Sequence, residues 1–193
     1  PEHVHIGDRA FLTEVVDGHE LRVSAGSFFQ SGVEAAELLV DAVRRAAPEL
    51  ATAGHAVDAY GGVGLFAATA MADVSKVTLI ESAKSSCFDA EHNLAGRDVN
   101  VVRKEVGHWQ ASNGRPIDVV VADPARPGLG KPGVNALVSA APAPIVLVSC
   151  DPVSLARDTT LLAAAGYQPE RVEVLDLFPQ TAHVETVTRF SKQ

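Results

Sequence analysis

The chain alternates between short apolar runs and longer stretches whose apolar residues recur at helical spacing. Runs rich in Val, Ile and Ala predict buried strands, and apolar residues at intervals of three and four predict helices. The predicted strands are 55–60, 77–80, 99–103, 118–122, 145–149, 171–177 and 184–190. The predicted helices are 33–47, 65–71, a segment that ends at Asn93, 134–140 and 152–165.

This alternation predicts an α/β fold of the Rossmann-like type, with a mostly parallel sheet and helices on both faces. The link between 171–177 and 184–190 is too short for a crossover helix, so the final strand should run antiparallel. Residues 1–30 contain two β-rich runs around Asp17-Gly18, which predicts a hairpin. We expect this hairpin to be an appendage, or the remnant of an upstream domain, attached to a domain formed by residues 31–193.

Composition limits the classes of protein to which the chain belongs. With 47% hydrophobic residues it has enough apolar surface for a full core, and its two cysteines make no disulfide framework. The sequence shows no apolar run of membrane-spanning length and no signal peptide before its first strand, so we expect a cytoplasmic protein. We also expect a monomer. The net charge of −8, without long Lys/Arg runs, argues against RNA binding through charge alone. The start at Pro1 is consistent with a piece of a longer protein.

A glycine loop follows the strand 55–60, with Gly61, Gly62 and Gly64 preceded by Asp58. Glycines let the backbone approach a ligand closely, and Glu81 ends the next strand, where an acidic residue can meet a ribose hydroxyl. These features predict a nucleoside cofactor, and the acidic residue before the glycines favours S-adenosylmethionine over NAD. The alternative is a tight turn followed by a solvated Glu.

Cys150 ends the strand 145–149, directly before Asp151-Pro152, which predicts a helix start. A helix amino terminus favours a thiolate and lowers a cysteine pKa, although the charge of Asp151 works against this. Because the last strand is antiparallel, Glu185 at its start should lie at the same edge of the sheet. Cys150 and Glu185 are therefore candidates for one cleft, with a buried cysteine and an edge-strand charge as the alternatives.

Three further positions have simpler readings beside the functional ones. Asp123-Pro124 ends the strand 118–122 and either faces the same cleft or forms a simple turn. His183 is better read as a structural residue, and Cys87 as a packing residue in a helix. No Cys/His spacing suits zinc, so we expect no metal site.

Several stretches occur together in the order seen in the RNA uracil-5-methyltransferase family. They are Phe28-Phe29-Gln30, 57–64, Asp123-Pro124-Ala125-Arg126, Ser149-Cys150-Asp151-Pro152, Leu155-Ala156-Arg157-Asp158 and 178–185. Over about residues 20–190 the chain resembles the catalytic domain of these enzymes. The resemblance implies a class I methyltransferase fold and a 5-methyluridine product in tRNA or rRNA. It also implies that Gln30, Tyr60, Glu81 and Asp123 line the S-adenosylmethionine site, that Cys150 is the nucleophile and that Glu185 is the base.

The chain departs from the family pattern at a few positions. Ser31-Gly32 stands where the family commonly has Val-Asn, Asp151 where it often has Asn, and Gly61 where it often has Cys. We expect this segment to lack the N-terminal RNA-binding β-barrel usual in the family, and therefore to bind RNA weakly. Two alternatives stay open: a methyltransferase for another substrate, with Cys150 incidental, and an S-adenosylmethionine-binding module without turnover.

Overall fold

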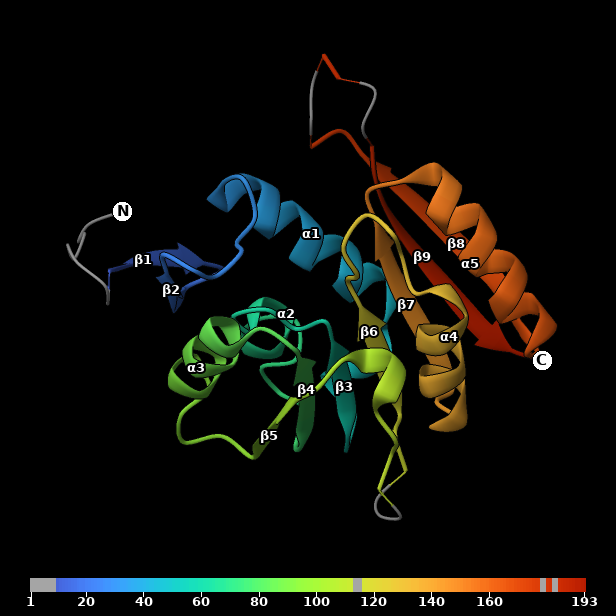
Figure 1. The fold of residues 1–193 in the computed structure, drawn as a ribbon, viewed down its shortest axis with the longest axis horizontal. Coiled ribbons are helices and arrows are strands. Elements are labelled where there is room, and N and C mark those ends of the chain that lie inside the picture. Colours follow the sequence, from blue (N-terminus) through green and yellow to red (C-terminus); the bar gives the residue numbers. More distant parts are fainter. Residues whose placement is uncertain (1–9, 113–115, 178–179, 182–183) are drawn as a thin grey trace.

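The computed structural model describes residues 10–112, 116–177, 180–181 and 184–193. Its main sheet consists of β3 (Ala56–Ala59), β4 (Val77–Glu81), β5 (Val99–Arg103), β6 (Val119–Ala122), β7 (Pro144–Ser149), β8 (Tyr167–Leu175) and β9 (Glu185–Lys192). The strand order is β5-β4-β3-β6-β7-β9-β8 (Figure 1). Strands β3 to β7 pair in parallel, whereas β9 runs antiparallel to both β7 and β8. The predicted fold class and the antiparallel final strand are confirmed.

Helices cover both faces of this sheet, and each face has its own apolar core (Figure 1). One core joins the sheet to α1 (Val33–Ala46), α2 (Leu65–Ala68) and α3 (Lys84–Asn93). The other joins it to α4 (Gly130–Ser139), α5 (Pro152–Ala164) and the short 3-10 helix η2 (Val106–His108). A second 3-10 helix, η1 (Pro48–Ala51), follows α1. Within the described ranges no helix combines the length and the apolarity needed to cross a bilayer.

Helix α2 ends at Ala68 and the chain then forms turns, so the helix is shorter than the predicted segment 65–71. Arg97 provides hydrogen-bond donors for backbone carbonyl groups of this segment. Its guanidinium donates hydrogen bonds to the backbone oxygens of Ala67, Met71 and Ala72. A side chain from a later loop thus replaces the helical hydrogen bonds that this segment lacks.

The predicted N-terminal hairpin is present as β1 (Phe11–Val16) and β2 (His19–Ser24), with Gly18 in the turn at a φ of 77°. Its second strand lies against α3, where Asp89 is fully buried. The Asp89 carboxylate accepts hydrogen bonds from Arg22 Nε, from the backbone and hydroxyl of Ser24, and from the hydroxyl of Ser27. The hairpin is therefore fastened to the main sheet through α3, and its status as a separate unit of residues 1–30 stays a prediction.

Candidate active site

Polar side chains at the carboxyl ends of four parallel strands point to one face of the sheet, the face covered by α1. Side chains alternate between the two faces along a strand. In β7, Val146 and Val148 belong to the core beneath α1, so Cys150 follows on the same face. The same alternation places the polar residues at the ends of β3, β4 and β6 on this face. The residues placed on this face are Asp58, Glu81, Asp123 and Cys150, and Glu185 joins them from the start of β9.

The pairing register brings Cys150 and Glu185 together. In the antiparallel β7–β9 ladder Ser149 is opposite Thr186, so the next residues, Cys150 and Glu185, are also opposite each other. The Thr186 hydroxyl donates a 3.0 Å hydrogen bond to the Ser149 carbonyl and closes the ladder just below them. Glu185 is only 5% exposed, whereas Cys150 is half-buried. The predicted meeting of these two residues at one edge of the sheet therefore has a direct basis in the register.

The electrostatic environment of this pair differs from the sequence-based expectation. Burial, followed by the charge of Asp123, raises the pKa of Glu185 to about 7. The pKa of the Cys150 thiol is raised rather than lowered, first by burial and then by Glu185. The sequence-based expectation weighed the helix start against the charge of Asp151, and it omitted burial of the thiol and the Glu185 carboxylate that β9 brings opposite it. Each group thus holds its proton more strongly when the other is ionised.

Asp123 connects this pair with the segment before α1. Its carboxylate accepts a hydrogen bond from Gln30 Nε2 at 3.4 Å, across 93 positions of sequence. Burial raises the pKa of Asp123 to about 7. Its backbone N–H donates to the Ala59 carbonyl, which fixes Asp123 beside the end of β3. Two residues that the family resemblance assigns to the cofactor, Gln30 and Asp123, are thus in contact.

The glycine loop folds back onto the end of β4. Glu81 accepts hydrogen bonds from the backbone N–H groups of Gly62, Ser82 and Ala83. At Gly61 a Cβ atom would lie 2.5 Å from Leu79 Cγ, so a larger residue here would have to displace the Leu79 side chain. At Gly62 the φ is 54° and a Cβ atom would meet no atom of the described part of the chain within 4 Å, so the outer side of the loop is open there. An open loop against a strand-end carboxylate is an arrangement that suits a nucleoside ligand.

Asp58 and Tyr60 flank the start of this loop and lie on opposite faces of the sheet. Asp58 is fully buried beneath α2, where one carboxylate oxygen accepts the Ala67 N–H and the other has no hydrogen-bond partner among the described residues. Burial raises its pKa to about 7, and the charges of Asp123 and Glu81 add to the rise. The Tyr60 ring instead packs with the core beneath α4, near Gly133, and burial raises its pKa to about 12. The side chain of Tyr60 therefore lies apart from the carboxylates, and its contact with a cofactor stays a prediction.

The charge of this edge indicates which ligand fits it. Four carboxyl groups converge there, and the pKa values of three of them are raised to about 7, in each case first by burial and in two of them also by the charge of a neighbouring carboxylate. A dinucleotide pyrophosphate would add negative charge to this group. A sulfonium or amino group would lower the repulsion. The four carboxyl groups are those of Asp58, Glu81, Asp123 and Glu185.

Sequence reasoning did not single out Arg126, which the structure connects with the site. This exposed residue lies in the loop after β6, and its charge acts to lower the pKa values of both Cys150 and Asp151. Its place in the stretch Asp123-Pro124-Ala125-Arg126 was the available signal. His183 lies outside the described residues, and among those described no three His, Cys, Asp or Glu side chains gather as a metal site requires.

The chain is similar to several curated proteins named as RNA methyltransferases. It is 42% identical over 187 residues to an uncharacterized RNA methyltransferase of Streptomyces avermitilis, which covers 93% of this chain and 42% of the relative. It is 35% identical over 189 residues to one of Enterococcus faecalis, with coverage of 94% and 41%. No family model matches the chain. The chain thus spans about two fifths of the length of these relatives.

A solved structure with the same fold comes from Pyrococcus abyssi. It is a tRNA (uracil-54, C5)-methyltransferase in complex with S-adenosyl-L-homocysteine, with a TM-score of 0.80 and 29% identity. The alignment covers 96% of this chain and 45% of that chain. The fold is thus that of Rossmann-like methyltransferases, and the nucleoside bound in this neighbour supports the cofactor predicted from the glycine loop.

Proposed function

We propose that this chain is the catalytic part of an S-adenosylmethionine-dependent enzyme that forms 5-methyluridine in RNA through a covalent adduct on Cys150. The observation that carries the proposal is the β7–β9 register, which sets a cysteine opposite a buried glutamate at the ligand-binding edge of the sheet. The resemblance in sequence, the RNA methyltransferase relatives and the Pyrococcus neighbour support the same assignment.

The residues at this edge fit the cofactor. The open side of the loop at Gly62 leaves room for a ligand, and the Glu81 carboxylate beneath it is an acceptor for ribose hydroxyls. Asp123 and Gln30, which are in contact, supply an acceptor and an amide on the side of Cys150. The convergent carboxylates favour a ligand with positive charge. When bound, S-adenosylmethionine supplies an electrophilic methyl group on a sulfonium, which C5 of the uracil accepts.

Cys150 provides the nucleophile that makes C5 reactive. C5 of uracil is itself a poor nucleophile, and addition of the thiolate to C6 forms an S–C6 bond and moves the electron pair of the C5–C6 double bond into an enolate. The resulting carbon at C5 is electron-rich and can take up a methyl group. Burial and then Glu185 raise the pKa of the Cys150 thiol, so these surroundings oppose formation of the thiolate that attacks C6.

Glu185 completes the reaction as the base. After methylation C5 still carries its proton, and removal of that proton re-forms the C5–C6 double bond while the S–C6 bond breaks and the thiolate leaves. A base with a pKa near the working pH is the most effective, and the pKa of Glu185 is raised to about 7 by burial and by Asp123. Its position opposite Cys150 places it near the ring that the thiol would hold.

Mass spectrometry of nucleosides tests the proposal. RNA incubated with the full-length protein and S-adenosylmethionine should contain 5-methyluridine, and RNA incubated with the Cys150→Ala variant should not. Cys87→Ala is the matched control, because Cys87 lies in α3 and should be dispensable for the reaction. Another methylated nucleoside, or 5-methyluridine formed by Cys150→Ala, would contradict the proposal. Cofactor binding without any methylated nucleoside would favour a binding module.

A further inference from the structure

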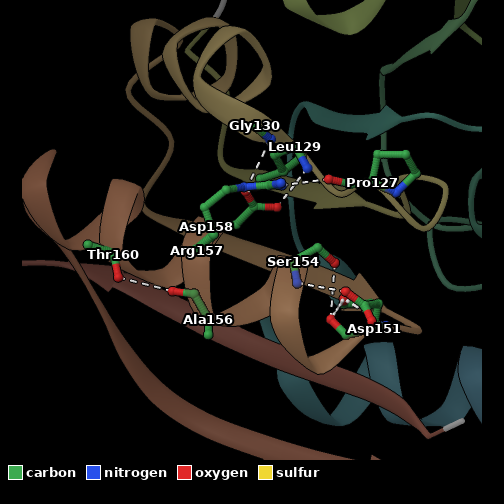
Figure 2. Close-up of polar contacts among 10 residues, drawn as sticks. Pro127, Leu129, Gly130, Asp151, Ser154, Ala156, Arg157, Asp158 and Thr160 are labelled. Carbon is green, nitrogen blue, oxygen red and sulfur yellow. Dashed lines mark hydrogen bonds and ion pairs between the residues drawn. The ribbon is translucent and has the colours of Figure 1, made fainter.

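The loop that joins β6 to α4 is held at both ends and carries Arg126 at its tip. Asp123, at the first end, is bound to the end of β3 through its backbone. A turn closed by a 2.8 Å hydrogen bond from Gly128 N to the Ala125 carbonyl places Arg126 and Pro127 at its centre. The second end, at Leu129 and Gly130, lies on helix α5 (Figure 2). The loop is thus anchored on both sides of Arg126.

Asp158 of α5 makes the second anchor. Its side chain is 1% exposed, and its carboxylate accepts the backbone N–H groups of Leu129 at 2.7 Å and of Gly130 at 3.1 Å (Figure 2). These are the first N–H groups of α4, which have no partner within their own helix. A carboxylate is favourable at this end of a helix because of the helix dipole. Asp158 therefore fixes where the loop ends and where α4 begins.

Arg157 completes the anchor from the surface side. Its guanidinium donates to Asp158 Oδ1 through both Nε and Nη2, and Nη2 also donates to the Pro127 carbonyl at 2.6 Å (Figure 2). Gly128, with a φ of 74°, lies so close to α5 that a Cβ atom would be 2.3 Å from Asp158 Oδ2. The loop backbone and the Arg157–Asp158 pair are thus in direct contact, with no space for a side chain between them.

We propose that Asp158 and Arg157 are positioning residues, which hold the loop from Asp123 to Gly130 on helix α5 so that Arg126 acts on the thiol of Cys150. The loop follows β6 and Cys150 follows the neighbouring strand β7, so both lie at the same edge of the sheet. Helix α5 begins directly after Cys150, which makes it a common support for the thiol and for the loop. The inference deepens the proposed role of Cys150 as nucleophile and rests on it.

The charges around Cys150 define what the loop contributes. Glu185 from β9 and Asp123 from the loop base act to raise the pKa of the thiol, together with burial, and Arg126 acts to lower it. If the loop is released from α5, Arg126 loses its fixed place and the carboxylates of Glu185 and Asp123 remain. The thiol should then ionise less readily.

The rate of Cys150 alkylation by iodoacetamide tests this inference on the protein without RNA. The rate is followed from pH 6 to pH 10 by mass spectrometry of the peptide that contains Cys150. Asp158→Asn should slow alkylation near neutral pH about threefold to tenfold, as expected for a rise of half a unit to one unit in pKa. Arg126→Gln should slow it similarly, and the double variant should be no slower than the slower single one, because Asp158 acts through Arg126.

Two controls separate positioning from a general loss of structure. Asp118→Asn removes a carboxylate that likewise accepts two consecutive backbone N–H groups, those of Gly54 and His55, at the opposite edge of the sheet. It should leave the Cys150 rate unchanged. Cys87, which is buried in α3, reports unfolding in the same sample.

Gly128→Ala disturbs the anchor from the loop side and should reproduce the effect of Asp158→Asn. If either variant also exposes Cys87, Arg157→Gln replaces it, because the Arg157 side chain is 47% exposed and its loss leaves the core closed. An unchanged or faster Cys150 rate in these variants, or effects that add fully to that of Arg126→Gln, would overturn the inference. Because alkylation needs neither RNA nor methyl transfer, its result is separate from the outcome for the proposed function.

Discussion

Replacing Glu185 by Gln should stabilise the folded protein at alkaline pH, although it removes the proposed base. Glu185 is 5% exposed, and burial together with Asp123 raises its pKa from 4.5 to about 7. Each pKa unit corresponds to about 1.4 kcal/mol, so ionising this carboxyl in the folded state costs about 3 kcal/mol above pH 7. A neutral glutamine of similar shape does not carry this cost.

The direction of the pH dependence follows from the same shift. The folded-state pKa is raised, so the folded protein binds a proton that the unfolded chain has released between about pH 4.5 and pH 7. The stability associated with the protonated carboxyl is present below pH 4.5 and is lost as the pH rises to 7. Glu185→Gln should therefore match the parent protein at pH 4.5 and exceed it at pH 8 by about 2–3 kcal/mol.

Urea unfolding of both proteins at pH 4.5 and pH 8, followed by circular dichroism, measures this difference. Glu173→Gln on the neighbouring strand β8 is the matched control with the opposite sign. Arg45, opposed by partial burial, lowers the pKa of Glu173, so its neutralisation should weaken the fold at pH 8. A Glu185→Gln protein that is no more stable than the parent at pH 8, or a gain that does not depend on pH, would refute the reasoning.

Three other predictions concern the cofactor, the RNA and the hairpin. Calorimetry should show that the 193-residue chain binds S-adenosylmethionine, and Glu81→Ala should weaken binding by about 1–3 kcal/mol if the carboxylate accepts ribose hydroxyls; tight NADH binding without a response to S-adenosylmethionine would contradict the cofactor. Filter binding should show weak RNA binding by this chain, because its net charge is −8; tight binding that weakens strongly with salt would show that a basic surface was missed. Asp89→Ala should lower the free energy of unfolding by about 3–5 kcal/mol, because it leaves Arg22 and the Ser24 N–H without their buried partner; a loss below about 1 kcal/mol in urea unfolding would show that the hairpin is not fastened there.

The elements of the fold were predictable because they depend on local patterns. The apolar runs that became β3 to β7, the Asp17-Gly18 turn of the hairpin and the Asp151 cap of α5 are all readable from neighbouring residues, and Asp151 indeed accepts the Ser154 N–H. The antiparallel direction of β9 followed from the length of one link. These features require no knowledge of what packs against them.

The site depends on contacts between distant segments, and there sequence reasoning reached less far. The thiol pKa of Cys150 is raised first by burial and then by Glu185, which lies 35 positions further along the chain, so the helix start and Asp151 did not suffice to give its direction. The Tyr60 side chain turned to the α4 face because its backbone has a φ of 61°, which breaks the alternation of β3. The hydrogen bonds that Asp158 accepts from Leu129 and Gly130 join segments 28 and 29 positions apart, which no local pattern predicts.

The covalent adduct tests the central claim most directly. Full-length Glu185→Gln protein incubated with substrate RNA and S-adenosylmethionine should accumulate bound to methylated RNA, because in the proposed mechanism thiolate addition and methylation precede the proton removal by Glu185. The complex should resist denaturation on a gel, and digestion should yield a Cys150 peptide linked to a methylated uridine. Cys150→Ala should give no such band. A Glu185→Gln enzyme that turns over normally without an adduct, or an adduct on a residue other than Cys150, would contradict the account.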